Sequence, residues 1–252
     1  FKMHLCQRCI DINGSRFGKV DIAKWRASKE EFLQQARSVY VPHADVQKRF
    51  KRIFPEVSTI VRTHSQTLIM DEHVTPHTPG ESLRVAIIGA TNTHKGGNVV
   101  LACARAALKH KLNISFVLIG YSNVVGLNKM INVTPTGAYR TEQLPAMLKQ
   151  ARCHLAFFPA VWPETFSFTL SHAYAVGLYP VSFALGALAA RIKEMGWGEV
   201  LPFSLVNKPE QINERLLNCN IPSKPSGLNA RLGKNYRSIL QDYYRWGDTP
   251  FA

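Results

Sequence analysis

The chain has 252 residues, of which 46% are hydrophobic and 19% are charged, and its formal net charge is +14. This composition is that of a globular protein and excludes a disordered chain. The excess of positive charge indicates an acidic partner, and nucleic acid, an anionic membrane surface and a phosphorylated small molecule all fit.

No apolar run reaches the roughly 18–20 residues that a membrane-spanning helix needs, so none is expected. The chain begins FKMHLCQRC, with no initiator methionine and no signal-peptide pattern, which suggests a piece of a longer protein. Among its cysteines only Cys6 and Cys9 form a CxxC pair, and Cys103, Cys153 and Cys219 are too scattered to supply a second pair. We therefore expect no metal site, and reduced thiols in a cytoplasmic protein.

The first 80 residues show short helical and strand patterns in alternation. The hydrophobic spacing predicts a helix over 20–37, a strand over 38–42, a helix over 43–54 and a strand over 57–62. Residues 63–82 are polar and rich in Thr, His, Pro and Gly, which is typical of a linker. We therefore predict two domains, residues 1–80 and residues 81–252.

After the linker, continuous apolar runs alternate with helical segments. The runs predict strands over 83–89, 114–120, 131–137, 154–160 and 179–184. Helices are predicted between them, the first over 97–110, and a last long helix over about 228–246. Strands that are apolar throughout are buried on both faces, so the pattern predicts an α/β domain with a doubly wound parallel sheet.

In such a domain ligands bind where strands end and helices begin. The loop after the first strand, GATNTHKGG, carries Lys95 and Gly96 at the start of a helix. Free amides and the positive end of a helix suit a phosphate there, although an ordinary turn with a solvated lysine fits equally. The loop after the third strand brings Gly137 and Tyr139 to a strand end, where the tyrosine could stack on a base or simply cover the core.

The stretch WPETFSFTLSHAYAVG follows the fourth strand. It places Glu164 directly before a helix that the spacing of Phe166, Leu170 and Ala173 defines. A carboxylate there could serve only as a helix cap, but the stiff, shielding WP pair before it favours a site. His172 has mostly apolar neighbours on its helix face, which favours a packed imidazole.

Four stretches together resemble a known family: RVAIIGATNTHKGG, VTPTGAYRTEQLPAML, FFPAVWPETFSFTLSHAYAVGLYPVSF and GALAARIKEMGWGEVLP. They are similar to the C-terminal, donor-binding domain of the retaining nucleotide-sugar glycosyltransferases of family four, which have the GT-B architecture of two Rossmann-like domains. The resemblance covers about residues 83–246. The earlier VYVPHADVQKRFKRIFPEVSTIVRTH resembles the last β-α-β segment of the N-terminal acceptor domain.

The resemblance implies a role for particular residues. The family's carboxylate that touches the donor sugar falls on Glu164, and its second carboxylate, which holds the ribose, falls on His172, a departure. The diphosphate lysine falls on Lys95, and its usual arginine partner falls on Ala90, a second departure. The residues implied in donor binding are Lys95, Gly96, Gly137, Tyr139, Thr165, Phe166, Ser167, Phe168 and His172.

The implied activity is transfer of a sugar from a UDP- or GDP-type donor to an acceptor hydroxyl with retention of configuration. The resemblance implies no metal or other cofactor, and an acceptor that is a glycan or a lipid-linked molecule in cell-surface polysaccharide or glycolipid synthesis. It suggests a cytoplasmic protein that contacts an anionic membrane surface, and a fragment that binds donor without turnover.

Two other classes of function fit parts of the sequence. The departures at His172 and Ala90 leave open a non-catalytic module that only binds nucleotide sugars. The net charge alone would allow nucleic-acid binding, but no helix-turn-helix, zinc or aromatic-basic pattern supports it, so no nucleic-acid partner is expected.

Overall fold

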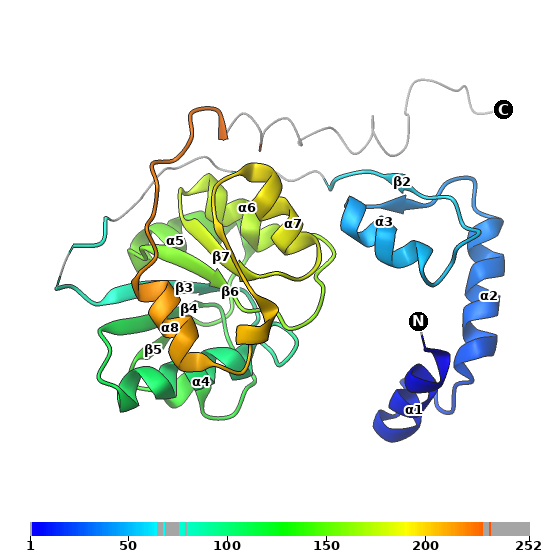
Figure 1. Ribbon diagram of the computed structural model, residues 1–252, viewed down its shortest axis with the longest axis horizontal. Helices are drawn as coiled ribbons and strands as arrows, with labels where there is room; N and C mark the ends of the chain where they lie inside the picture. Colours follow the sequence, from blue (N-terminus) through cyan, green and yellow to red (C-terminus); the bar gives the residue numbers. More distant parts are fainter. Residues whose placement is uncertain (1, 65–67, 69–75, 79, 229–231, 233–252) are drawn as a thin grey trace. The chain divides into compact units, whose positions relative to one another are not determined.

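The computed structural model describes residues 2–64, 68, 76–78, 80–228 and 232 (Figure 1). The chain divides into two compact units, Phe1–Thr63 and His64–Ala252. Much of the segment expected to be a linker, and most of the long helix expected over 228–246, lie outside the described residues. Within the described part, no helix is long and apolar enough to cross a membrane.

The first unit contains two helices followed by a small β-α-β element. Its strands pair in parallel, Tyr40 with Ile60 and Val41 with Val61. The helix predicted over 20–37 is confirmed, and Asp21 caps it by accepting from the amides of Ala23 and Lys24. The first helix was not expected. The elements are α1 (Met3–Asn13), α2 (Ile22–Gln34), β1 (Tyr40–Val41), α3 (Ala44–Lys51) and β2 (Ile60–Val61).

The second unit is built on a six-stranded sheet in the order β5-β4-β3-β6-β7-β8, and every pair of neighbours is parallel. The five predicted strands are confirmed within two residues at each end, and a sixth, β8, closes the sheet. The strands are β3 (Leu83–Ile88), β4 (Ile114–Ile119), β5 (Val133–Pro135), β6 (Leu155–Phe158), β7 (Tyr179–Phe183) and β8 (Glu199–Leu201). The predicted doubly wound α/β domain is therefore confirmed.

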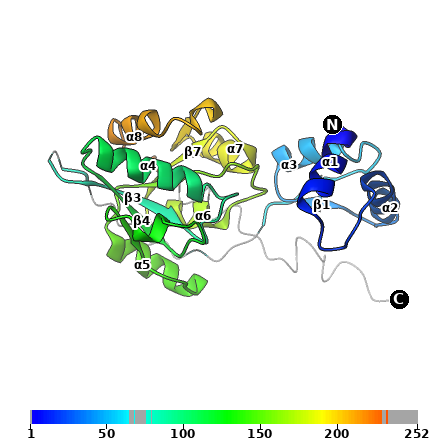
Figure 2. The same ribbon diagram turned by 90° about the horizontal axis from the view of Figure 1, so that it is seen from below.

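Helices cover both faces of this sheet, which explains why β6 and β7 are buried along their whole length. Helix α4 packs against α8 on one face, and α5 lies beside α6 on the other (Figure 2). Asn213, fully buried, ties α8 to α4 by donating to the carbonyl of Cys103 at 2.9 Å. The helices are α4 (Gly97–Lys109), α5 (Leu144–Ala151), α6 (Phe168–Ala175), α7 (Gly186–Met195) and α8 (Pro209–Leu217), with short 3-10 turns η1 (Leu127–Lys129), η2 (Thr141–Gln143) and η3 (Phe203–Leu205).

The strand order fixes where a ligand can bind. Strand β3 pairs with both β4 and β6, so the chain leaves β3 toward one edge of the sheet and leaves β6 toward the other. The carboxyl ends of β3 and β6 are therefore the switch point of the sheet, the place where such sheets bind ligands.

Candidate functional site

The loops after β3 and β6 meet at the switch point. The amide of Val161 donates to the carbonyl of His94 at 3.0 Å, and the His94 and Trp162 rings lie 5.7 Å apart. The closest approach is at Gly96, where φ is +81° and a Cβ would lie 2.0 Å from the carbonyl oxygen of Pro159. Only glycine fits there, so the predicted site residue Gly96 brings the two loops together.

Lys95 and Glu164 face each other across this junction. The Nζ of Lys95 lies 3.7 Å from Oε1 of Glu164, whose side chain is 11% exposed while that of Lys95 is 37% exposed. The Lys95 amide donates to Oδ1 of Asn92 at 2.9 Å, which fixes the backbone below the lysine. The site therefore holds a largely shielded carboxylate beside a cation that can still reach solvent.

Most of the predicted donor-binding residues line one cavity of about 280 Å³. It is lined by His64, Lys95, Trp162, Pro163, Glu164, Thr165, Phe166, Ser167, Phe168 and Thr169. The structure thus gathers Lys95 with Glu164 and the four residues after it. Gly96, Gly137, Tyr139 and His172 are not among the residues that line the cavity.

The loop after Glu164 does not form the helix that the sequence pattern predicted. Helix α6 begins at Phe168, so three residues separate it from Glu164, and Ser167 has φ +69° and ψ +89°. The carbonyl of Phe166, which would accept an intrahelical bond if the helix began earlier, accepts instead from Nη1 of Arg191. The carboxylate therefore stands on a strained loop before the helix, not on the helix itself.

Residues of helix α7 hydrogen-bond to the backbone carbonyls of this loop. The amide of Ala187 donates to the carbonyl of Glu164 at 3.0 Å. Arg191, only 8% exposed, donates to the carbonyls of Phe166 and Ser167 at 2.8 Å each. Its guanidinium also lies 3.9 Å from the Phe166 ring centroid. Burial lowers the pKa of Arg191 to about 10, which leaves it charged at neutral pH.

His64 is a further residue of the cavity that the sequence did not indicate. Its ring stacks on Phe168 at 5.3 Å between centroids and meets the edge of Phe166 at 5.1 Å. Burial, with a smaller effect from the charge of Arg191, lowers the pKa of His64 below its usual value. This favours a neutral imidazole, which can both donate and accept a hydrogen bond.

His172 is packed inside the domain. It is 4% exposed, and neither ring nitrogen has a hydrogen-bond partner among the described residues. Burial lowers its pKa, so the imidazole is held neutral. The expectation of a packed imidazole is confirmed, and a contact between His172 and a ribose stays a prediction.

Gly137 and Tyr139 lie in the loop after β5, next to the end of β4. The Gly137 amide donates to the carbonyl of Gly120 at 2.9 Å. Tyr139 is half-buried and packs against the core, and burial raises its pKa. The ring therefore covers core residues, and a role beside a nucleotide base stays a prediction.

No protein-family model matches the sequence, and no curated protein matches it. Its fold does match solved structures. Sucrose-phosphate synthase from Thermosynechococcus elongatus aligns over 90% of this chain and 59% of its own, with a TM-score of 0.61 and 19% identity. TarM from S. aureus aligns over 92% of this chain and 45% of its own, with a TM-score of 0.61 and 16% identity. HepE from Anabaena aligns over 84% of this chain and 62% of its own, with a TM-score of 0.58 and 16% identity.

These proteins are GT-B glycosyltransferases. The chain matches part of the GT-B fold, and its second unit is a Rossmann-like domain of that fold. It spans between 45% and 62% of the length of these three proteins. TarM was solved with fondaparinux, alpha-GlcNAc-glycerol and UDP, and HepE with UDP and glucose. At this level of identity the likeness concerns the fold alone, so the chemistry of this chain has to be argued from its own crevice.

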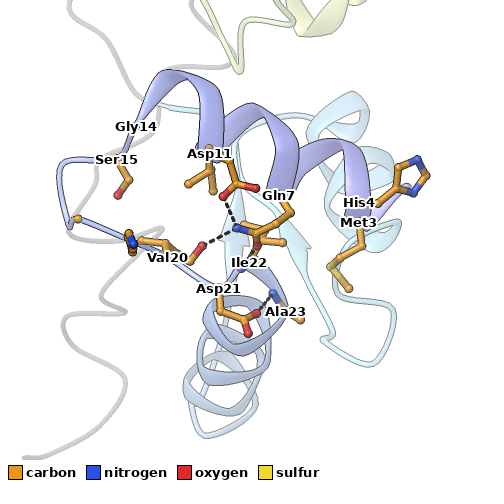
Figure 3. Close-up of a pocket in the computed structure, with 13 residues that line it drawn as sticks. Met3, His4, Gln7, Asp11, Gly14, Ser15, Val20, Asp21, Ile22 and Ala23 are labelled. Carbon is orange, nitrogen blue, oxygen red and sulfur yellow. Dashed lines mark hydrogen bonds between the residues drawn. The ribbon is translucent and has the colours of Figure 1, made fainter.

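A larger hollow in the first unit offers less chemistry. It measures about 1080 Å³ and lies between α1 and α2 (Figure 3). The side-chain amide of Gln7 donates to the carboxylate of Asp11 and to the backbone carbonyl of Val20, and it accepts from the backbone amide of Ile22. Asp21 is occupied as the cap of α2. Because these polar groups serve the protein itself, we place the site at the Lys95–Glu164 crevice despite its smaller volume.

The described residues contain no group of three or more His, Cys, Asp or Glu side chains that could hold a metal ion. Cys6 accepts a hydrogen bond from Arg26, and Cys9 is exposed. Cys103 and Cys153 are buried, and burial raises the pKa of each thiol to about 12. These last two thiols are therefore inert core residues.

Proposed function

We propose that the chain is the donor-binding part of a glycosyltransferase that moves a sugar from a UDP- or GDP-type donor to an acceptor hydroxyl with retention of configuration. The observation that carries this proposal is the convergence of Lys95 and Glu164 on one cavity at the switch point of the sheet. A cation for a diphosphate and a carboxylate for sugar hydroxyls are the two groups that a nucleotide-sugar site needs.

Each group has a part in the chemistry. Lys95, at the start of α4, binds the diphosphate, and Glu164 accepts hydrogen bonds from sugar hydroxyls, orienting the sugar rather than acting as the base. The leaving nucleotide gains negative charge as the glycosidic bond breaks. The ammonium of Lys95 and the backbone amides of residues 165–168 stabilise that charge, so the transfer needs no metal ion. Gly137 and Tyr139 lie toward the base of the nucleotide.

The acceptor would be a glycan or a lipid-linked molecule of cell-surface polysaccharide or glycolipid synthesis. The complexes of TarM and HepE with UDP and sugars support this class of donor and acceptor. A net charge of +14 suits a cytoplasmic protein that reaches its acceptor at an anionic membrane surface. Because an acceptor-side base would belong to a more complete acceptor domain, this chain alone should bind donor without turnover.

A second candidate is a nucleotide-sugar-binding module without catalysis. It is favoured by Ala90, exposed at the end of β3 where the resemblance implies an arginine, and by the neutral, buried His172 where it implies a carboxylate. Both changes remove charged contacts to the donor, but neither touches Lys95 or Glu164.

Titration calorimetry on this chain with UDP, GDP and a short oligonucleotide tests the proposed site. We expect one nucleoside diphosphate to bind at micromolar concentration and the oligonucleotide to bind weakly. Lys95→Met, which removes the cation of the site, should weaken this binding. Lys109→Met, which removes an exposed lysine at the far end of α4, is its control for the loss of one positive charge. Binding of the oligonucleotide alone would overturn the proposal. A turnover assay on the longer natural protein then separates a transferase from a binding module.

A further inference from the structure

Arg191 is a buried cation whose described hydrogen-bond partners are all neutral. Its guanidinium donates to the carbonyls of Phe166 and Ser167 and, at 2.7 Å, to Oγ of Ser171. In the part of the chain that the structure describes, no carboxylate lies within ion-pair distance of it. The exposed carboxylate of Glu194, one turn further along α7, acts on the guanidinium without forming such a pair. A buried charge without a paired carboxylate is costly, and an apolar side chain would fill the same space without that cost. The packing of α7 alone therefore does not account for an arginine here.

The two carbonyl contacts fix the direction of two peptide groups. In a trans peptide the C=O of one residue and the N–H of the next point in opposite directions, and the described chain has no cis peptide bond. Since Arg191 draws the carbonyls of Phe166 and Ser167 toward itself, the amides of Ser167 and Phe168 point away from it. Arg191 lies outside the cavity, whereas Ser167 and Phe168 line it. The loop thus has these carbonyls toward α7 and the following amides on the opposite side, in a segment whose residues line the cavity.

These amides include donors with no protein partner. Within the described residues, the amides of Thr165, Phe166 and Ser167 make no hydrogen bond. The hydroxyl of Ser167 faces that of Thr169 at 3.3 Å, so it does not cap the helix that follows. A run of unpaired amides beside Lys95 is suited to oxygen atoms that carry negative charge.

We propose that Arg191 is a positioning residue for the diphosphate of the donor: its forked contacts turn the Ser167 peptide so that the amide faces the phosphate oxygens, and those oxygens add negative charge near a guanidinium that has no paired carboxylate. This inference rests on the proposed function. It assigns the orientation of the loop after Glu164 to a residue that lies 27 positions further along the chain and does not line the cavity.

Lysine at this position keeps the charge but loses the fork, because an ammonium is a single point and cannot hold two carbonyls and a hydroxyl in one plane. Arg191→Lys therefore separates orientation from charge, and Arg191→Met removes both. The matched control is Arg215→Lys in the same domain, where the arginine is exposed and pairs with Glu199. Ser167 itself is kept in all three variants.

Two measurements test the proposal on the whole chain. Calorimetry with UDP and GDP, and with their nucleoside monophosphates, gives the contribution of the second phosphate. Backbone amide NMR on isotope-labelled protein reports whether the Ser167 signal moves when the nucleoside diphosphate is added. We expect Arg191→Lys to lose at least about tenfold in diphosphate affinity and much less in monophosphate affinity, and to lose the Ser167 shift, while Arg215→Lys behaves as wild type.

The outcomes separate this inference from the function on which it rests. If wild type binds neither UDP nor GDP, both are overturned. If wild type binds one of them but its Ser167 amide does not respond, or Arg191→Lys binds as tightly as Arg215→Lys, only the role of Arg191 is overturned. If both Arg191 variants fail to fold, a Ser167 amide that does not respond in wild type still overturns the role of Arg191.

Discussion

Gly186, the first residue of α7, lies directly against the backbone of Glu164. A Cβ at Gly186 would lie 2.9 Å from the amide nitrogen of Glu164 and 2.7 Å from Cα of Pro163, and the φ of Gly186 is +69°. The next residue, Ala187, donates to the carbonyl of Glu164. The start of α7 therefore sets the position of the Glu164 backbone. About one helical turn later, Arg191 of the same helix holds the carbonyls of Phe166 and Ser167.

Replacing Gly186 should therefore cost more than replacing a glycine of the same conformation elsewhere. Gly186→Ala adds a clash with backbone to the strain of a positive φ, and we expect a loss of about 2–4 kcal/mol in the free energy of unfolding. Gly196→Ala at the other end of α7, with φ +67° and no atom within 4 Å of its Cβ, is the control and should cost about 1–2 kcal/mol. Urea denaturation measures both. Equal losses would mean that the contact with Glu164 is not tight.

The pairing of Lys95 with Glu164 predicts opposite effects of their replacement on diphosphate binding. Lys95→Met removes the cation and should weaken binding of the nucleoside diphosphate by about tenfold or more. Glu164→Gln removes a negative charge 3.7 Å from the ammonium, so the affinity for the nucleoside diphosphate should stay equal or become tighter. The same change should weaken binding of the intact nucleotide sugar. Calorimetry with the nucleoside diphosphate and its sugar ester measures both. A Glu164→Gln variant that loses both ligands equally would remove the carboxylate from the sugar subsite.

Ser167 holds a backbone conformation that favours glycine, which predicts a trade between stability and binding. Ser167→Gly should raise the free energy of unfolding by about 0.5–1 kcal/mol by relieving φ +69°, and should weaken diphosphate binding because the loop gains freedom. Arg152→Gly, at the exposed left-handed C-cap of α5, should stabilise by a similar amount without changing the affinity. Denaturation and calorimetry on the two variants make the comparison. Unchanged affinity in Ser167→Gly would show that the strain serves no binding role.

The elements that carry the fold were readable in the sequence because their apolar runs are long and end in turn residues. Strands such as Leu83–Ile88 and Ile114–Ile119 are buried on both faces over most of their length, and this requires a nearly continuous apolar run, broken only at the half-buried second residue of each strand. From strand ends alone, the loops holding Lys95 and Glu164 could be placed at one edge of the sheet. Strand β8 was missed because Glu199–Leu201 is too short to show a period.

The support of the site was less readable, because it depends on tertiary contacts. Helix α6 begins two residues later than Phe166 since Arg191, distant in sequence, takes the carbonyl that an earlier turn would use. A signal for Arg191 exists: it falls on the same buried helix face as Ala187, Leu188 and Met195. An arginine within an apolar stripe indicates a buried partner, but the sequence does not tell which backbone it holds.

The buried imidazole of His172 predicts how stability depends on pH. Burial lowers its pKa in the folded chain, so below about pH 6.5 the unfolded chain binds a proton that the folded chain does not. Its stabilising effect is thus complete above about pH 6.5 and is lost as the pH falls toward the folded pKa. His64 and His154, whose pKa values burial also lowers, act in the same direction.

His172→Leu should therefore flatten the fall in stability between about pH 7 and about pH 5, and should cost little at about pH 8, because neither ring nitrogen has a described partner to lose. His172→Glu should be strongly destabilised at neutral pH, since a buried carboxylate would find no donor there. Urea denaturation at several pH values measures both variants. A tolerated His172→Glu with tighter nucleotide binding would instead place this side chain at the ribose, and an unchanged pH dependence in His172→Leu would assign the effect to His64 and His154.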